Sequence, residues 1–137
     1  MTTTPAALTK WFVVHFAADI TFAVPLLLAP EIFLGALGWP SVDPFAARLV
    51  AAALFGIGIE SLMSRNAAPG TFLTMLRLKI IWSTAAVVGM ALTVVQYPSF
   101  RIPISYVLII IFVAFNVLWG YWRRRLKQEL EAAGSSV

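Results

Sequence analysis

The sequence has no cysteine, a single histidine and few charged side chains. Without cysteine it cannot form a disulfide, a thiolate nucleophile, an iron–sulfur ligand or a cysteine-bound metal site. The one histidine, His15, excludes two histidine ligands to haem within the chain, and with Asp19 it gives only two metal ligands. No serine, histidine and acid arrangement suits a hydrolase. We therefore predict no metal, no cofactor and no catalytic residue, and favour a non-enzymatic protein.

The scarcity of charge also excludes a water-soluble fold. Charged residues make up 12% of the 137 residues and hydrophobic residues 61%, and a soluble chain could not bury so much apolar surface. The mean hydropathy of +0.89 and apolar runs of about 19 or more residues are typical of helices that cross a bilayer. We predict an all-α integral membrane protein, an antiparallel four-helix bundle surrounded by lipid.

The apolar runs predict one domain over residues 11–122, between an N-terminal segment at 1–10 and a charged helical tail at 123–137. A cleaved signal peptide is disfavoured, because His15 and Asp19 would interrupt its apolar core. The four spans are expected at residues 11–29, 45–63, 72–97 and 102–122.

The first connection, residues 30–44, is too short to cross the membrane and too apolar for an ordinary loop. We expect a short interfacial helix over residues 31–37, followed by Trp39 as an anchor at headgroup level. Asp43 followed by Pro44 predicts the start of the second span, since an acidic N-cap and a proline in the first turn favour helix initiation.

Basic residues predict the orientation of the spans. If the spans alternate in direction, eight of the ten basic residues fall on the side of the two termini, and only Arg48 and Arg101 fall on the other. Because basic residues are retained on the inside, we expect both termini in the cytoplasm and the protein in the plasma membrane. Their position at span ends also explains the net charge of +4 without a nucleic-acid partner.

Ionisable side chains within the spans need partners or uses, because a charge near mid-membrane costs at least about 2.5–3.5 kcal/mol. At 1.5 Å per residue, Asp19 would be the deepest, about 12–14 Å from the inner boundary. Two interpretations stay open: a structural layer of polar pairs, or a cavity that binds an ion, a proton or a polar headgroup. The candidate binding residues are Asp19, His15, Glu60, Asn116 and Lys79.

The structural interpretation predicts particular pairs. Glu60 would pair with Arg77 or Lys79, because a short connection makes the second and third spans antiparallel neighbours. On the other side of the membrane, Arg48 would pair with residues of the first connection. The candidates for that pair are Glu31 and Asp43.

A stripe of small residues with a charge near each end follows one face of the second span. It consists of Arg48, Ala52, Gly56 and Glu60, at four-residue intervals. Small residues let helices approach closely, and charged residues rarely face lipid tails, so we expect this face to contact protein. Further small positions at Ala53, Gly58 and Gly89 predict contacts with another copy of the chain or with a membrane partner protein. The predicted helix-packing positions are Ala52, Gly56, Gly58 and Gly89.

The stretch PEIFLGALGWPSVDPFAARLVAAALFGIGIES is an apolar loop leading into a span with one early arginine and closely spaced glycines. It resembles small four-span bacterial membrane proteins of the DoxX-like families. The resemblance implies the four-span layout. The named DoxX activity, a membrane subunit of a quinone-linked oxidoreductase, cannot be assigned to particular residues here.

The sequence thus predicts a non-enzymatic accessory or scaffold protein, or a binder of a lipophilic ligand. A second hypothesis is an oligomeric transporter or proton-coupled carrier built around Asp19 and Glu60. The third is the quinone-linked membrane subunit that the resemblance implies.

Overall fold

The computed structural model of the chain describes residues 5–134, and this part is built of helices joined by short connections. In chain order they are α1 (Ala6–Leu28), α2 (Pro30–Ala36), α3 (Pro44–Met63), α4 (Pro69–Gln96) and α5 (Pro103–Gly134), with 3₁₀ turns η1 (Ser64–Asn66) and η2 (Pro98–Phe100). Four helices, α1, α3, α4 and α5, are long and apolar enough to cross a membrane. The predicted all-α class with four spans is therefore confirmed.

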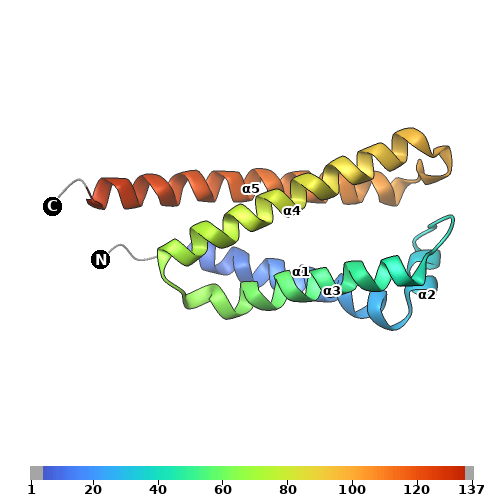
Figure 1. Cartoon of the computed structure of the whole chain (residues 1–137), viewed down its shortest axis with the longest axis horizontal. Coiled ribbons are helices and arrows are strands. Elements are labelled where there is room, and N and C mark those ends of the chain that lie inside the picture. Colours follow the sequence, from blue (N-terminus) through green and yellow to red (C-terminus); the bar gives the residue numbers. More distant parts are fainter. Residues whose placement is uncertain (1–4, 135–137) are drawn as a thin grey trace.

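The four long helices pack as two antiparallel pairs (Figure 1). One pair is α1 with α3, and the other is α4 with α5. α4 starts beside the end of α3 and crosses away from it, so the pairs are close at one end and diverge toward the other. We call the close end the terminal end, because the described chain begins and ends there, and the opposite end the α2 end.

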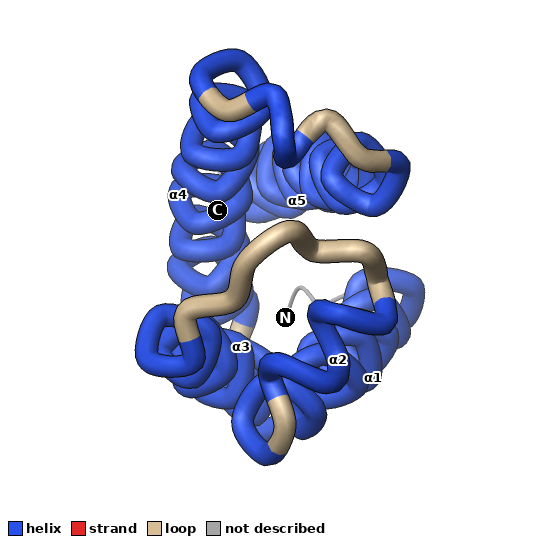
Figure 2. Tube along the Cα trace, turned by 90° about the vertical axis from the view of Figure 1, so that its right-hand side faces the viewer, coloured by secondary structure: helices blue, strands red, loops and turns tan. Residues whose placement is uncertain are grey.

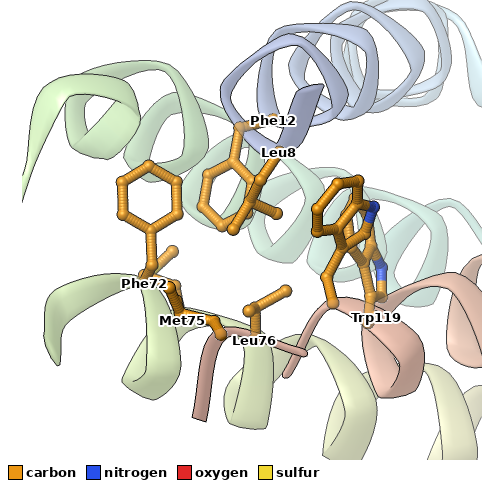
Figure 3. Packing of buried hydrophobic residues seen from close by; sticks show 8 residues of the cluster. Leu8, Phe12, Phe72, Met75, Leu76 and Trp119 are labelled. Atoms are coloured by element: carbon orange, nitrogen blue, oxygen red, sulfur yellow. The ribbon is translucent and has the colours of Figure 1, made fainter. Parts of the chain in front are cut away.

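An apolar and aromatic cluster joins the two pairs at the terminal end (Figure 3). The ring of Phe12 in α1 lies 4.7 Å from that of Phe72 in α4 and 5.9 Å from that of Trp119 in α5. Helix association in lipid depends on close packing of this kind, so the cluster sets how the pairs meet. Its buried members are Leu8, Phe12, Phe72, Met75, Leu76, Trp119, Trp122 and Leu126.

The buried face of α3 differs from the predicted one. It consists of Ala47, Ala51, Leu54, Gly58 and Ser61, which recur at intervals of three and four residues. The first four pack against α1, and Ser61 contacts Lys79 of α4. The predicted stripe is exposed instead, and apart from the hydrogen bond of Arg48 to α1 its expected contact with protein stays a prediction. At its start the stripe is offset by one residue from the buried face, a rotation of about 100° around the helix axis. The exposed stripe consists of Arg48, Ala52, Gly56 and Glu60.

The connection between α1 and α3 contains the short helix expected there, α2. Asp43 caps α3 as predicted: its Oδ1 accepts hydrogen bonds from the backbone N–H groups of Phe45, at 2.9 Å, and Ala46, at 3.2 Å. Gly38 has a φ of +81°, which favours glycine and turns the chain into the loop before α3. In that loop, Trp39 packs edge-on against Phe100 of η2, with 5.4 Å between ring centroids. The loop of one pair therefore contacts the turn of the other at the α2 end.

α5 continues as a helix beyond the predicted fourth span to Gly134. Charged pairs four residues apart support this extension, with 3.0 Å between Arg125 Nε and a Glu129 carboxylate oxygen and 3.4 Å between Lys127 Nζ and one of Glu131. The predicted N-terminal segment and tail both extend past the described residues, at 1–4 and 135–137.

Candidate functional site

A cavity of about 700 Å³ lies between the two helix pairs. All four long helices line it, and α2, the loop after α2 and η2 contribute to its wall at the α2 end. Figure 2 shows this loop crossing the end of the molecule between the helices. Most of the lining side chains are apolar, as in pockets that bind hydrocarbon-rich molecules.

A polar cluster lies at the cavity wall and consists of His15 and Asp19 of α1, Lys79 of α4 and, behind Lys79, the fully buried Ser61 of α3. Lys79 Nζ lies 3.1 Å from His15 Nδ1 and donates a hydrogen bond to Ser61 Oγ at 2.6 Å. His15 Nδ1 also lies 2.8 Å from Asp19 Oδ2, one helical turn along α1. The polar cluster thus brings together three candidate binding residues, His15, Asp19 and Lys79, all of which line the cavity.

Aromatic rings enclose the ammonium group at the centre of the polar cluster. Lys79 is only 1% exposed, and its Nζ lies 5.1 Å from the ring centroid of Phe12 and 5.3 Å from that of Trp119. The imidazole of His15 meets the rings of Phe115 and Trp119 edge-on. A buried cation needs such partners, because removing it from water without them costs several kcal/mol.

One ring nitrogen of His15 cannot satisfy both of its polar neighbours. To bond Asp19 Oδ2, Nδ1 must donate a proton, whereas to bond the ammonium of Lys79 it must accept one. When Lys79 donates to Nδ1, Asp19 Oδ2 has no donor among the described residues, although the Asp19 side chain is only 9% exposed. The cavity wall therefore holds a buried carboxylate with capacity for a further hydrogen-bond donor.

Gly58 makes room for the carboxylate on the α3 side. A Cβ atom at this position would lie 2.8 Å from Asp19 Cβ and 3.3 Å from Asp19 Oδ2. No other residue type fits here without a shift of α1 against α3, so the close approach of these helices depends on this glycine.

Asn116, another candidate binding residue, links α4 to α5. Its Nδ2 lies within hydrogen-bond distance of the backbone oxygen of Ile80, at 3.1 Å, and of Ser83 Oγ and Thr84 Oγ1, both at 2.8 Å. The amide nitrogen of Asn116 therefore contacts residues of α4 that do not belong to the polar cluster. Any ligand-binding role for Asn116 stays a prediction.

Glu60 does not form the predicted pair with Arg77 or Lys79 in the part of the chain that the structure describes. Glu60 and Arg77 are both exposed, and Glu60 Oε1 accepts a hydrogen bond from Ser64 Oγ. Lys79 contacts Ser61 instead, because the rotation of α3 turns residue 61, and not residue 60, toward the other pair.

Arg48 also has a different partner from the predicted one. Its Nε donates a hydrogen bond to the backbone oxygen of Leu27 at 3.1 Å, and it forms no ion pair with Glu31 or Asp43 within residues 5–134. Leu27 lies in the last turn of α1, where backbone oxygens lack helical partners. Arg48 therefore caps the end of α1, while the Asp43 carboxylate already caps α3.

The predicted small packing positions differ in their surroundings. Gly58 contacts Asp19, whereas a Cβ at Gly56 or Gly89 would meet no atom within 4 Å. Gly89 is exposed and lies at the edge of the cavity. Ala52 and Gly56 are exposed in the described part of the chain, and their packing role stays a prediction about contacts between chains.

Sequence reasoning missed two buried serines. Ser61 is adjacent to Glu60, a charged residue that drew the prediction instead. The one sequence signal for Ser61 is its helical spacing from Ala47, Ala51 and Gly58, which puts it on the same face of α3. Ser105, at the start of α5, is 5% exposed and lines the cavity, and its Oγ has no hydrogen-bond partner in the described chain. No sequence pattern distinguishes it from other serines in a first helical turn.

The fold and the cavity define a small polytopic membrane protein with four candidate spans in contact with the lipid bilayer. Comparison of the chain with protein-family models, with curated proteins and with solved structures finds no match. The comparisons therefore do not support the DoxX-like resemblance.

Proposed function

We propose that the protein binds a single lipophilic molecule in the cavity between its helix pairs and acts as a non-enzymatic accessory protein of the plasma membrane. The observation that carries this proposal is the combination of apolar walls with a buried polar cluster in one cavity of about 700 Å³. Ligand pockets typically have this composition, with few polar groups that fix orientation.

The dimensions of the cavity support an elongated ligand. Its wall on α5 runs from Ser105 to Trp119, which corresponds to about 21 Å along a helix. The long dimension of the cavity runs parallel to the helices and is shorter than the thickness of the hydrocarbon core, which is about 30 Å. A molecule with an acyl or isoprenoid chain would lie in the cavity in the orientation that it has in the bilayer.

The carrier hypothesis has less support, because it requires Asp19 and Glu60 to act together. Asp19 lines the cavity, whereas Glu60 is exposed and bonds Ser64 in the turn η1 that follows its helix. The quinone-linked hypothesis depended on the family resemblance, and no observation of the described residues favours it.

Cavity filling tests the proposed function, with two neighbouring alanines of α4 as a matched pair. Ala86 lines the cavity, while Ala85 is exposed and does not. We expect Ala86→Phe to lose most of the lipophilic molecule that the wild type retains through purification, because the added ring occupies its volume, and Ala85→Phe to retain it. The measurement is native mass spectrometry from mild detergent, together with extraction of the bound molecule. Equal retention by wild type and Ala86→Phe would contradict the proposal.

A further inference from the structure

We infer that the cavity selects an uncharged amphiphile with a hydroxyl head, whose O–H donates a hydrogen bond to the Asp19 carboxylate. This inference rests on the proposed function, because it specifies the ligand class of the same cavity. It follows from the charge balance of the cavity wall, from the accessibility of each polar group and from the hydrogen bond that Asp19 lacks.

The charges of the polar cluster cancel. With His15 neutral, Asp19 and Lys79 carry one negative and one positive charge. The remaining ionisable residue in the wall, Asp43, belongs to the α2 end, where its carboxylate caps α3. A charged head at the polar cluster would therefore lose its hydration without meeting a net opposite charge.

Of the two charged groups in the polar cluster, the more accessible one is the hydrogen-bond acceptor. Lys79 is 1% exposed and already contacts His15, Ser61 and two aromatic rings, whereas Asp19 is 7% exposed. A carboxylate or phosphate head offers only acceptors and would meet the Asp19 carboxylate first, with repulsion between like charges. A hydroxyl head offers a donor without adding charge.

The carboxylate of Asp19 also has an unmet need for such a donor. Its Oδ2 competes with Lys79 for one nitrogen of His15, and Gly58 closes the α3 side so tightly that a Cβ atom there would lie 3.3 Å from Oδ2. The cavity is the side on which a ligand can supply the missing hydrogen bond. A buried carboxylate gains considerably from a donor, because hydrogen bonds to charged groups are stronger than neutral ones.

The experiment is a competition among three amphiphiles that share one chain and differ in head charge. Tetradecanol, tetradecanoate and tetradecylamine are added in equal amounts to the purified full-length protein in detergent at neutral pH, and bound species are counted by native mass spectrometry. Ala86→Phe measures binding outside the cavity and is subtracted. We expect the wild type to bind the alcohol at least about tenfold better than either charged probe.

Charge variants of the polar cluster sharpen the test. Asp19→Asn leaves a net positive polar cluster and should shift the preference toward tetradecanoate by about tenfold or more, while Lys79→Met should shift it toward the amine. The double variant restores neutrality and should again prefer the alcohol. If a single variant fails to fold, the wild-type ratios and the double variant still decide the outcome.

The outcomes separate the two proposals. If a charged probe binds the wild type as well as the alcohol does, or if the charge variants leave the ranking unchanged, the hydroxyl assignment is wrong while cavity binding stands. If no probe binds above the Ala86→Phe background, both the proposed function and this inference are overturned.

Discussion

Gly58 and Asp19 illustrate how one small residue permits a buried carboxylate between two membrane helices. The backbone of α3 approaches so closely that a Cβ at position 58 would collide with Asp19 Cβ at 2.8 Å. Asp19 in turn depends on His15 for its one described polar contact. At the scale of single residues, the position of the Asp19 carboxylate therefore depends on the space that Gly58 leaves and on the polar contact with His15. One added methyl group at Gly58 should disturb the helix packing and this contact together.

Gly58→Ala should lower the stability of the folded protein, by about 1–3 kcal/mol if the helices shift to relieve the overlap. Gly56→Ala is the matched control on the same helix, since a Cβ there meets nothing within 4 Å. The control should be neutral or stabilising by up to about 1 kcal/mol, because alanine favours helix over glycine. Thermal unfolding in detergent, followed by circular dichroism, measures both. Equal effects of the two substitutions would show that α1 and α3 are farther apart than described.

At the scale of elements, the rotation of α3 about its axis decides which side chain reaches the other helix pair. Ser61 is fully buried and bonds Lys79, whereas its neighbour Glu60 is exposed. Through this contact and through His15, α1, α3 and α4 share one buried ammonium group. The polar cluster and the apolar and aromatic cluster at the terminal end therefore both hold the two helix pairs together.

Ser61→Ala should destabilise the protein by about 1–3 kcal/mol, because it removes an acceptor from a buried ammonium group. Glu60→Ala removes a charge from the adjacent position and should have little effect, since Glu60 is exposed and, among the described residues, its side chain bonds Ser64 of the adjoining turn η1. Chemical or thermal unfolding of both variants in the same detergent gives the comparison. A larger loss for Glu60→Ala would indicate that α3 presents the predicted stripe to protein after all, within the chain or in an oligomer.

At the scale of the whole molecule, two antiparallel helix pairs meet at the terminal end and diverge toward the α2 end (Figure 1). A cavity lies between them. The terminal end also carries most of the basic residues, including Arg65, Arg77, Lys79 and those after Trp122. The charge bias predicts that this end faces the cytoplasm. The cavity then extends from the polar cluster toward the outer surface, where the α2–α3 loop and η2 contact each other.

Single cysteines test the predicted orientation without background labelling, because the natural chain has no cysteine. Glu31→Cys and Gln128→Cys place a thiol at exposed positions of α2 and of the α5 extension. On intact cells, a membrane-impermeant maleimide should label Glu31→Cys, and it should label Gln128→Cys only after the membrane is permeabilised. The reverse pattern would place both termini outside the cell.

The sequence by itself determined the fold class, the four spans and several helix ends. Long apolar runs indicate helices that cross a membrane, whatever their neighbours are. The start of α3 at Asp43 and Pro44 depends on local backbone chemistry, so it also required no knowledge of neighbouring helices. It also identified His15, Asp19 and Lys79 as candidates, since ionisable residues are conspicuous in apolar spans.

Only the tertiary structure decided which side chains meet. In a soluble helix, the polar face shows which side is outside, but in lipid both the packed and the exposed faces are apolar, so the sequence does not fix the rotation of a helix. For that reason the expected partner Glu60 gave way to Ser61, one position along, and Arg48 bonded a backbone oxygen of α1 instead of a carboxylate. The cavity likewise results from the divergence of two helix pairs, a property of packing that no local pattern in the chain encodes.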